Sequence, residues 1–108
     1  MATEHAMDRV DERELQNTLA SRLRYWSQAG NALQRLFEFP DFKSALAFVN
    51  AVGEKAEMLG HHPDIDIRYN RVKLSLTSHD AGGITRRDLI LASYIDEIIS
   101  GYEARKTA

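Results

Sequence analysis

The chain has 108 residues, 14 of them lysine or arginine and 16 aspartate or glutamate, which gives a formal net charge of −2 at pH 7. This length predicts a single domain with a core of its own, and the slight negative charge argues against direct contact with nucleic acid. The sequence has no cysteine, which excludes disulfides and thiolate catalysis, and no apolar run of membrane-spanning length, so we expect a cytoplasmic protein.

The N-terminal part is predicted to hold a tail and a first helix. Residues 1–8 are polar and show no periodicity, so we expect a flexible tail followed by one domain over residues 9–104. Leu15, Leu19 and Leu23 then recur every four residues. This spacing is typical of a short amphipathic helix.

An aromatic and apolar segment follows the first helix. It contains Gly30 and Asn31 side by side, a pair that is typical of a turn, and we therefore predict two strands joined there. Pro40 ends the segment.

A second helix is predicted over about residues 42 to 59. Asp41 is a suitable N-cap for it, and Gly60 suits the left-handed position that often follows a helix. The apolar residues of this segment recur at spacings that place them on one face. They are Phe42, Ala45, Leu46, Val49, Val52, Ala56 and Leu59.

After this helix, apolar and polar residues alternate from Ile65 to Leu76, with a turn residue at Asn70. The alternation predicts an antiparallel hairpin. His79 shares the parity of Thr77, so it would lie on the polar side of the second strand if that strand extended so far.

Residues Thr85 to Asp88 have the form of a capping box, which predicts the start of a third helix. The apolar residues of this helix occupy more than one face. They are Leu89, Ile90, Leu91, Ala92, Tyr94, Ile95, Ile98, Ile99 and Tyr102. Such a helix in a small domain usually buries its second face against another subunit, so we expect a homodimer or homotetramer.

These elements follow one another as helix, strand, strand, helix, strand, strand, helix. Strand pairs with short turns and intervening helices are typical of the α+β class. We therefore predict a four-stranded antiparallel sheet with three helices packed on one face.

The residue types that could carry chemistry gather where the chain leaves the second helix. His61 and His62 lie side by side there, and Pro63 follows them. Together with His79, they could supply the acid and the base of a dehydration or an isomerisation without a metal, because histidine exchanges protons near neutral pH. Glu57, one helical turn before His61, could hydrogen-bond its ring and fix the tautomer.

Two other interpretations stay open on the residues alone. A His-His-Pro tripeptide is more often a surface turn than a site. Three histidines with a nearby carboxylate could instead hold zinc or non-haem iron, although adjacent side chains point apart and the pair spacing of H-E-x-x-H is absent. Metal-free chemistry is the stronger hypothesis, so we predict neither a metal nor another cofactor.

The residues themselves carry a resemblance that extends over about residues 10 to 100. From Phe37 to Ile95 the chain contains F-x-F-x-D-F-x(5)-F, A-E-x(3)-H-H-P-x(5)-Y, T-x-H-x(3)-G-I-T-x-x-D and A-x-x-I. These motifs, together with Trp26, resemble the pterin-4a-carbinolamine dehydratases. The combination of E-x(3)-H-H-P with the later histidine is a specific signature.

The resemblance implies an activity. Members of the family are hydro-lyases that convert 4a-hydroxytetrahydropterin to quinonoid dihydropterin, so that an aromatic amino acid hydroxylase can recycle its tetrahydrobiopterin. By position, His61 and His79 would be the acid–base pair, and His62 would orient the pterin and could share in the proton transfer. The resemblance also implies sheets that join across a dimer and dimers that pair through helices.

Other positions are implied to line the substrate site. Glu57 and Pro63 would shape one wall, Thr77 and Ser78 would border the pterin ring, and Arg87 would lie at the mouth.

Two positions depart from vertebrate-like members of the family, and they bear on substrate preference. Gly60 stands where those members have an aspartate, and Ile65 where they have a tryptophan. Asp88 matches an aspartate of the family, although its capping role already explains it. The alternative function is a non-catalytic binding, scaffolding or transcriptional co-regulator protein on the same fold.

Overall fold

The computed structural model describes residues 9–107, with side chains for residues 9–102. The predicted tail, residues 1–8, lies outside the described residues. The elements in chain order are α2 (Glu12–Ser21), β1 (Ser27–Ala29), β2 (Ala32–Glu38), α3 (Phe42–Leu59), β3 (Asp64–Arg68), β4 (Arg71–Leu76), the 3-10 helix η1 (His79–Ala81) and α4 (Arg86–Thr107). The predicted α+β class and order of elements are confirmed.

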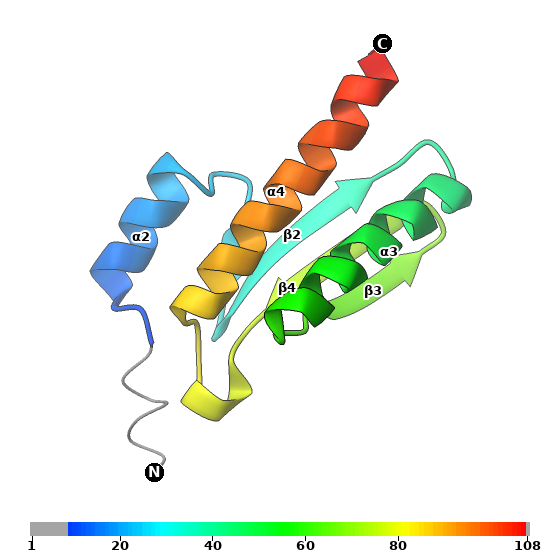
Figure 1. The fold of residues 1–108 in the computed structure, drawn as a ribbon. Helices are drawn as coiled ribbons and strands as arrows, with labels where there is room; N and C mark the ends of the chain where they lie inside the picture. Colours follow the sequence, from blue (N-terminus) through cyan, green and yellow to red (C-terminus); the bar gives the residue numbers. More distant parts are fainter. Residues whose placement is uncertain (1–8, 108) are drawn as a thin grey trace.

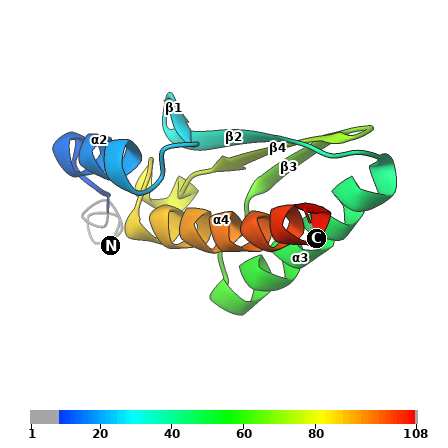
Figure 2. The same ribbon diagram turned by 90° about the horizontal axis from the view of Figure 1, so that it is seen from above.

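The four strands form one antiparallel sheet in the order β1-β2-β4-β3. The two hairpins meet at its centre, where β2 pairs with β4 from Leu33 opposite Leu76 to Glu38 opposite Arg71. α3 and α4 lie across the same face of this sheet, and α2 lies beside the first turns of α4 (Figures 1 and 2). The other face of the sheet carries no helix in the described part of the chain.

The core lies between the sheet and the helices. Phe48 of α3 is fully buried, and its ring lies 4.7 Å from that of Phe37 and 5.1 Å from that of Phe39. Burial of a side chain of this kind stabilises the fold by about 1.5–3 kcal/mol. The other large, fully buried apolar residues come from every layer: Leu15, Leu33, Val52, Val72, Leu74, Leu76, Leu91 and Ile95.

Both predicted ends of α3 are confirmed. The Asp41 carboxylate accepts a hydrogen bond of 2.8 Å from the Ser44 N–H. At the other end Gly60 is left-handed, with φ 64°, a conformation that glycine adopts at little cost. Its N–H and that of His61 are donated to the last carbonyls of the helix, so the exit of the chain is fixed in direction.

α4 differs from its prediction in how its apolar residues are covered. Most of them are buried within one chain, because α4 lies between α2 and α3 and against the sheet (Figure 1). Ile90, with 49% of its surface exposed, is the large apolar residue of this helix left in solvent. An apolar pattern around the helix therefore does not require a second subunit, and the oligomer stays a prediction.

β4 ends at Leu76, so the parity argument does not place His79. Ser78 and Gly83 instead exchange backbone hydrogen bonds of 3.0 and 3.2 Å, which fold the intervening residues into a tight loop. His79 is exposed at the start of η1 in this loop. Among the described residues, no helix is long and apolar enough to cross a membrane.

Candidate active site

His61 is the buried member of the histidine pair. It follows the left-handed Gly60 at the end of α3, and only 9% of its surface is exposed. Its ring Nε2 lies 2.5 Å from Oδ1 of Asp88, which belongs to the first turn of α4. A contact between residues 27 positions apart thus joins the end of one helix to the start of another.

Asp88 is fully buried and makes further hydrogen bonds. Its Oδ2 accepts 2.9 Å hydrogen bonds from the Thr85 backbone N–H and from the Ser78 hydroxyl. The Ser78 and Thr85 hydroxyl oxygens are 2.8 Å apart, so these two side chains also contact each other. The predicted capping box is confirmed, and the same carboxylate serves both the helix start and the histidine.

His62 lies outside this buried network. Its Nε2 contacts Oε2 of Glu57, and the two side chains are 63% and 77% exposed. The prediction that Glu57 would hold His61 is therefore wrong. The left-handed turn at Gly60 directs His61 into the interior, and His62 is the ring that meets the last turn of α3.

His79 lies on a loop that is fastened on both sides by the first turn of α4. Ser78, before it, donates its hydroxyl hydrogen to Asp88. Asp80, after it, accepts a 3.0 Å hydrogen bond from the guanidinium of Arg87. Asp88 thus holds His61 directly and the His79 loop through Ser78.

The remaining predicted residues surround this centre. The Thr77 hydroxyl donates a 2.6 Å hydrogen bond to the Asn31 carbonyl in the β1–β2 turn. Ser78 is buried, so its hydroxyl acts inside the network. Pro63 is half-buried beside His62. Within the described part of the chain, no group of three or more His, Asp or Glu side chains is placed to hold a metal ion.

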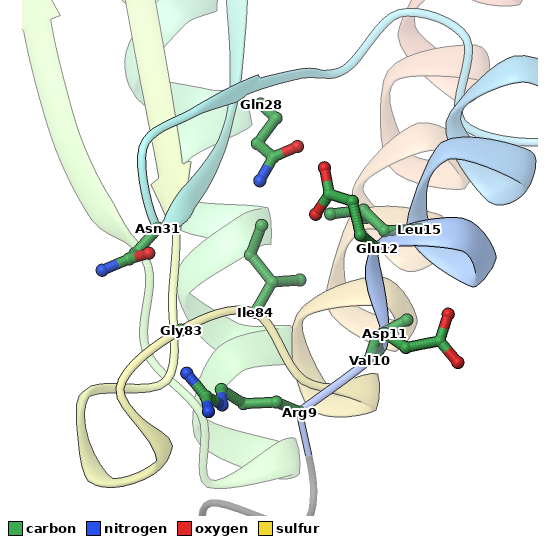
Figure 3. Close-up of a pocket in the computed structure, with 9 residues that line it drawn as sticks. All are labelled: Arg9, Val10, Asp11, Glu12, Leu15, Gln28, Asn31, Gly83 and Ile84. Atoms are coloured by element: carbon green, nitrogen blue, oxygen red, sulfur yellow. The ribbon is translucent and has the colours of Figure 1, made fainter.

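A cavity of about 430 Å³ lies between the start of α2, the β1–β2 turn and the Gly83–Ile84 segment that follows the His79 loop. Gln28 and Glu12 face its interior from β1 and α2, and Ile84 forms its floor (Figure 3). Its lining contains none of the three histidines. Gly83 borders it, and the Gly83 backbone pairs with Ser78, so the cavity and the histidine network share one wall.

The direct contact of Asp88 with His61 is the feature that the sequence reasoning missed. Spacing could not reveal it, because the two residues are far apart in the chain and capping alone accounted for the carboxylate. The carboxylate serves both partners at once, because Oδ1 of Asp88 contacts His61 while Oδ2 caps α4.

Comparisons with known proteins give a consistent result. Residues 8–98 match the family model of Pterin 4 alpha carbinolamine dehydratase. A relative from Acidobacterium capsulatum is 56% identical over 79 residues, which cover 73% of this chain and 86% of the relative. A relative from Chloroflexus aurantiacus is 53% identical over 93 residues, which cover 86% of this chain and 99% of the relative. Both are named "Putative pterin-4-alpha-carbinolamine dehydratase".

Two solved structures are similar as well. The transcriptional coactivator/pterin dehydratase from Brucella melitensis has a TM-score of 0.79 at 34% identity, covering 83% of this chain and 97% of its own. A pterin dehydratase-like protein identified as a RuBisCO assembly factor in the alpha-carboxysome has a TM-score of 0.56 at 22% identity, covering 68% of this chain and 84% of its own. The second likeness concerns the fold alone.

Proposed function

Because the chain belongs to the pterin-4a-carbinolamine dehydratase family, we propose that it dehydrates 4a-hydroxytetrahydropterin to quinonoid dihydropterin. One structural observation supports this activity for this particular chain. The two segments that bear His61 and His79 are both tied to a single buried carboxylate, that of Asp88. The predicted acid–base pair is thus anchored at one point of the fold.

The reaction needs one acid and one base and no change of oxidation state. A base removes the proton from N5 of the substrate, the C4a–O bond breaks, and an acid protonates the departing oxygen so that it leaves as water. A double bond forms between N5 and C4a. His61 and His79 fill these two roles, and positioned groups of this kind typically accelerate a proton transfer by about 10²–10⁴-fold.

The exposed residues orient the substrate. His62, paired with Glu57, presents its ring to the pterin from the solvent side, and Pro63 limits the same wall. Thr77 borders the ring next to the buried Ser78. Arg87 acts at the mouth through Asp80, which it holds beside His79.

This activity supports tetrahydrobiopterin recycling by an aromatic amino acid hydroxylase, in a cytoplasmic homo-oligomer. The acid–base pair uses no metal and no other cofactor. Because Gly60 and Ile65 replace the aspartate and the tryptophan of vertebrate-like members, the wall near His62 is less polar and less aromatic. The preferred pterin should therefore carry a different side chain from the one those members accept.

A second candidate is a non-catalytic role, as a binding partner or transcriptional co-regulator. It is favoured by the description of the Brucella melitensis protein as a transcriptional coactivator as well as a pterin dehydratase. The two candidates differ in whether the histidines are needed for turnover.

The experiment that tests the proposal is stopped-flow decay of enzymatically generated 4a-hydroxytetrahydropterin, followed by near-ultraviolet absorbance. Wild-type protein should accelerate the decay, and His61→Ala and His79→Ala should each lose most of the acceleration. A folded wild-type protein that leaves the decay unchanged would contradict the proposal and favour the binding role.

A further inference from the structure

Asp88 holds His61 in a way that selects between the two nitrogens of its ring. Oδ2 of Asp88 is occupied by the Thr85 N–H and the Ser78 hydroxyl, which fix the plane of the carboxylate. Oδ1 is left for His61 alone. A carboxylate can only accept hydrogen bonds, so the hydrogen of the 2.5 Å contact lies on Nε2 of His61.

Nδ1 is therefore the nitrogen of the neutral ring that has a lone pair to offer, because a neutral imidazole carries one N–H and one acceptor. Nδ1 makes no hydrogen bond within the described residues. In the same part of the chain, no buried side-chain nitrogen or oxygen lacks a hydrogen-bond partner. It follows that Nδ1 reaches the surface, although most of the ring is buried.

We propose that Asp88 is a positioning residue, which keeps His61 in the Nε2–H tautomer so that Nδ1 exchanges the proton with the substrate. This inference rests on the dehydratase function proposed above. Asp88 does not touch the substrate, because it is fully buried behind the ring. Its effect on catalysis passes through His61, as a buried aspartate orients a catalytic histidine in serine proteases.

Asp88→Asn is the discriminating substitution, because the amide has nearly the shape of the carboxylate. Its oxygen keeps the hydrogen bonds from the Thr85 N–H and the Ser78 hydroxyl, which leaves the NH₂ group facing Nε2 of His61. An N–H donor there requires Nε2 to become the acceptor and moves the ring hydrogen to Nδ1. The variant should then lose about 10²–10⁴-fold in kcat, with KM little changed.

The direct readout is ¹⁵N NMR of protein labelled in histidine, at a pH where the ring is neutral, with His61→Ala used to assign the signals. Wild-type protein should show His61 as the Nε2–H tautomer, and Asp88→Asn should show Nδ1–H. Asp96→Asn is a matched control: Asp96 lies on the same helix and accepts a 2.8 Å hydrogen bond from the ring N–H of Trp26. It should lower stability and leave both the tautomer of His61 and kcat unchanged.

The outcomes separate this inference from the proposed function. An active wild-type protein with His61 in the Nδ1–H form would overturn the assignment, and this measurement does not depend on the folding of any variant. Full activity and an unchanged tautomer in folded Asp88→Asn would overturn the role of Asp88. A wild-type protein with the Nε2–H tautomer but no dehydratase activity would overturn the proposed function, and with it the catalytic consequence.

Discussion

His61 and His62 are neighbours in the chain, and each places Nε2 against a carboxylate, yet the two pairs differ in almost every other respect. The side chains of His61 and Asp88 are 10% and 0% exposed, whereas those of His62 and Glu57 are 63% and 77% exposed. The Asp88 carboxylate accepts two further hydrogen bonds, whereas the Glu57 carboxylate is largely exposed to solvent. The same type of contact is thus a fixed part of the interior in one case and an adjustable surface pair in the other.

The difference in burial between His61 and His62 arises at Gly60. Gly60, in the left-handed region, turns the chain between α3 and β3, so that one histidine enters the space beside α4 and the next stays outside. Exposed ion pairs contribute about 0–1 kcal/mol, because water and salt compete with the contact. A buried hydrogen-bond donor that loses its acceptor costs about 1–3 kcal/mol, because it is left unsatisfied away from water.

The largest expected difference is between the activities of variants at His61 and at His62. His61→Ala removes the proposed acid–base group and should lower kcat by about 10²–10⁴-fold. His62→Ala removes a ring that orients the substrate, so it should act mainly on KM. Steady-state kinetics of carbinolamine dehydration measure both constants. Equal losses of kcat in the two variants would show that exposure does not divide their roles.

The two carboxylates, Asp88 and Glu57, should also differ in how much they contribute to the free energy of unfolding. Asp88→Ala leaves the buried Nε2–H of His61 and the Ser78 hydroxyl without their acceptor and removes the cap of α4. Each unsatisfied buried donor costs about 1–3 kcal/mol and the lost cap about 1 kcal/mol, so the free energy of unfolding should fall by about 3–5 kcal/mol. Glu57→Ala should change it by less than about 1 kcal/mol. Urea unfolding followed by Trp26 fluorescence gives both values. A cost at Glu57 as large as that at Asp88 would contradict the contrast.

The sequence predicted the parts of this arrangement that depend on local structure. Asp41, Gly60 and the capping box at Thr85 act within a few residues of themselves, so their chemistry is visible as spacing. The order of helices and strands followed from periodicity for the same reason. The three histidines were found as candidates because their residue type and the family motif single them out.

The partners of these residues could not be predicted in the same way. Whether His61 meets Glu57 or Asp88 depends on the angle at which the chain leaves α3 and on how α4 packs, and neither is encoded in spacing. The apolar surface of α4 shows the same limit. Its residues indicated burial correctly, but the cover is this chain's own sheet and helices.

A weaker contrast is expected between Arg87 and Arg86. Arg87 pairs with Asp80 next to His79, whereas Arg86 pairs with Glu14 of α2, each at 3.0 Å and on the surface. Arg87→Ala should lower kcat/KM by less than about tenfold, since an exposed pair is worth about 0–1 kcal/mol. Arg86→Ala should leave kcat/KM unchanged. Equal loss in both variants would indicate a general effect of charge at the start of α4.

The smallest effect should come from Asp41, a carboxylate in water with no histidine beside it. The hydrogen bond from the Ser44 N–H, with help from the Ser44 side chain and the charge of Lys43, holds the pKa of Asp41 below its usual value of 3.8. A lowered pKa in the folded protein stabilises the fold above pH 3.8, and this contribution is lost as the pH falls through the lowered value. Asp41 should therefore add slightly to stability at neutral pH and nothing in strong acid.

Asp41→Asn isolates this contribution, because asparagine is an equally good N-cap and does not titrate. The variant should lose slightly less stability than wild-type protein when the pH is lowered from 7 to below 3.8, as measured by thermal unfolding at both pH values. Asp41→Ala, which lacks the cap, should be less stable than Asp41→Asn at every pH. If Asp41→Asn were instead the more acid-sensitive protein, the hydrogen bond would not be stabilising the charge.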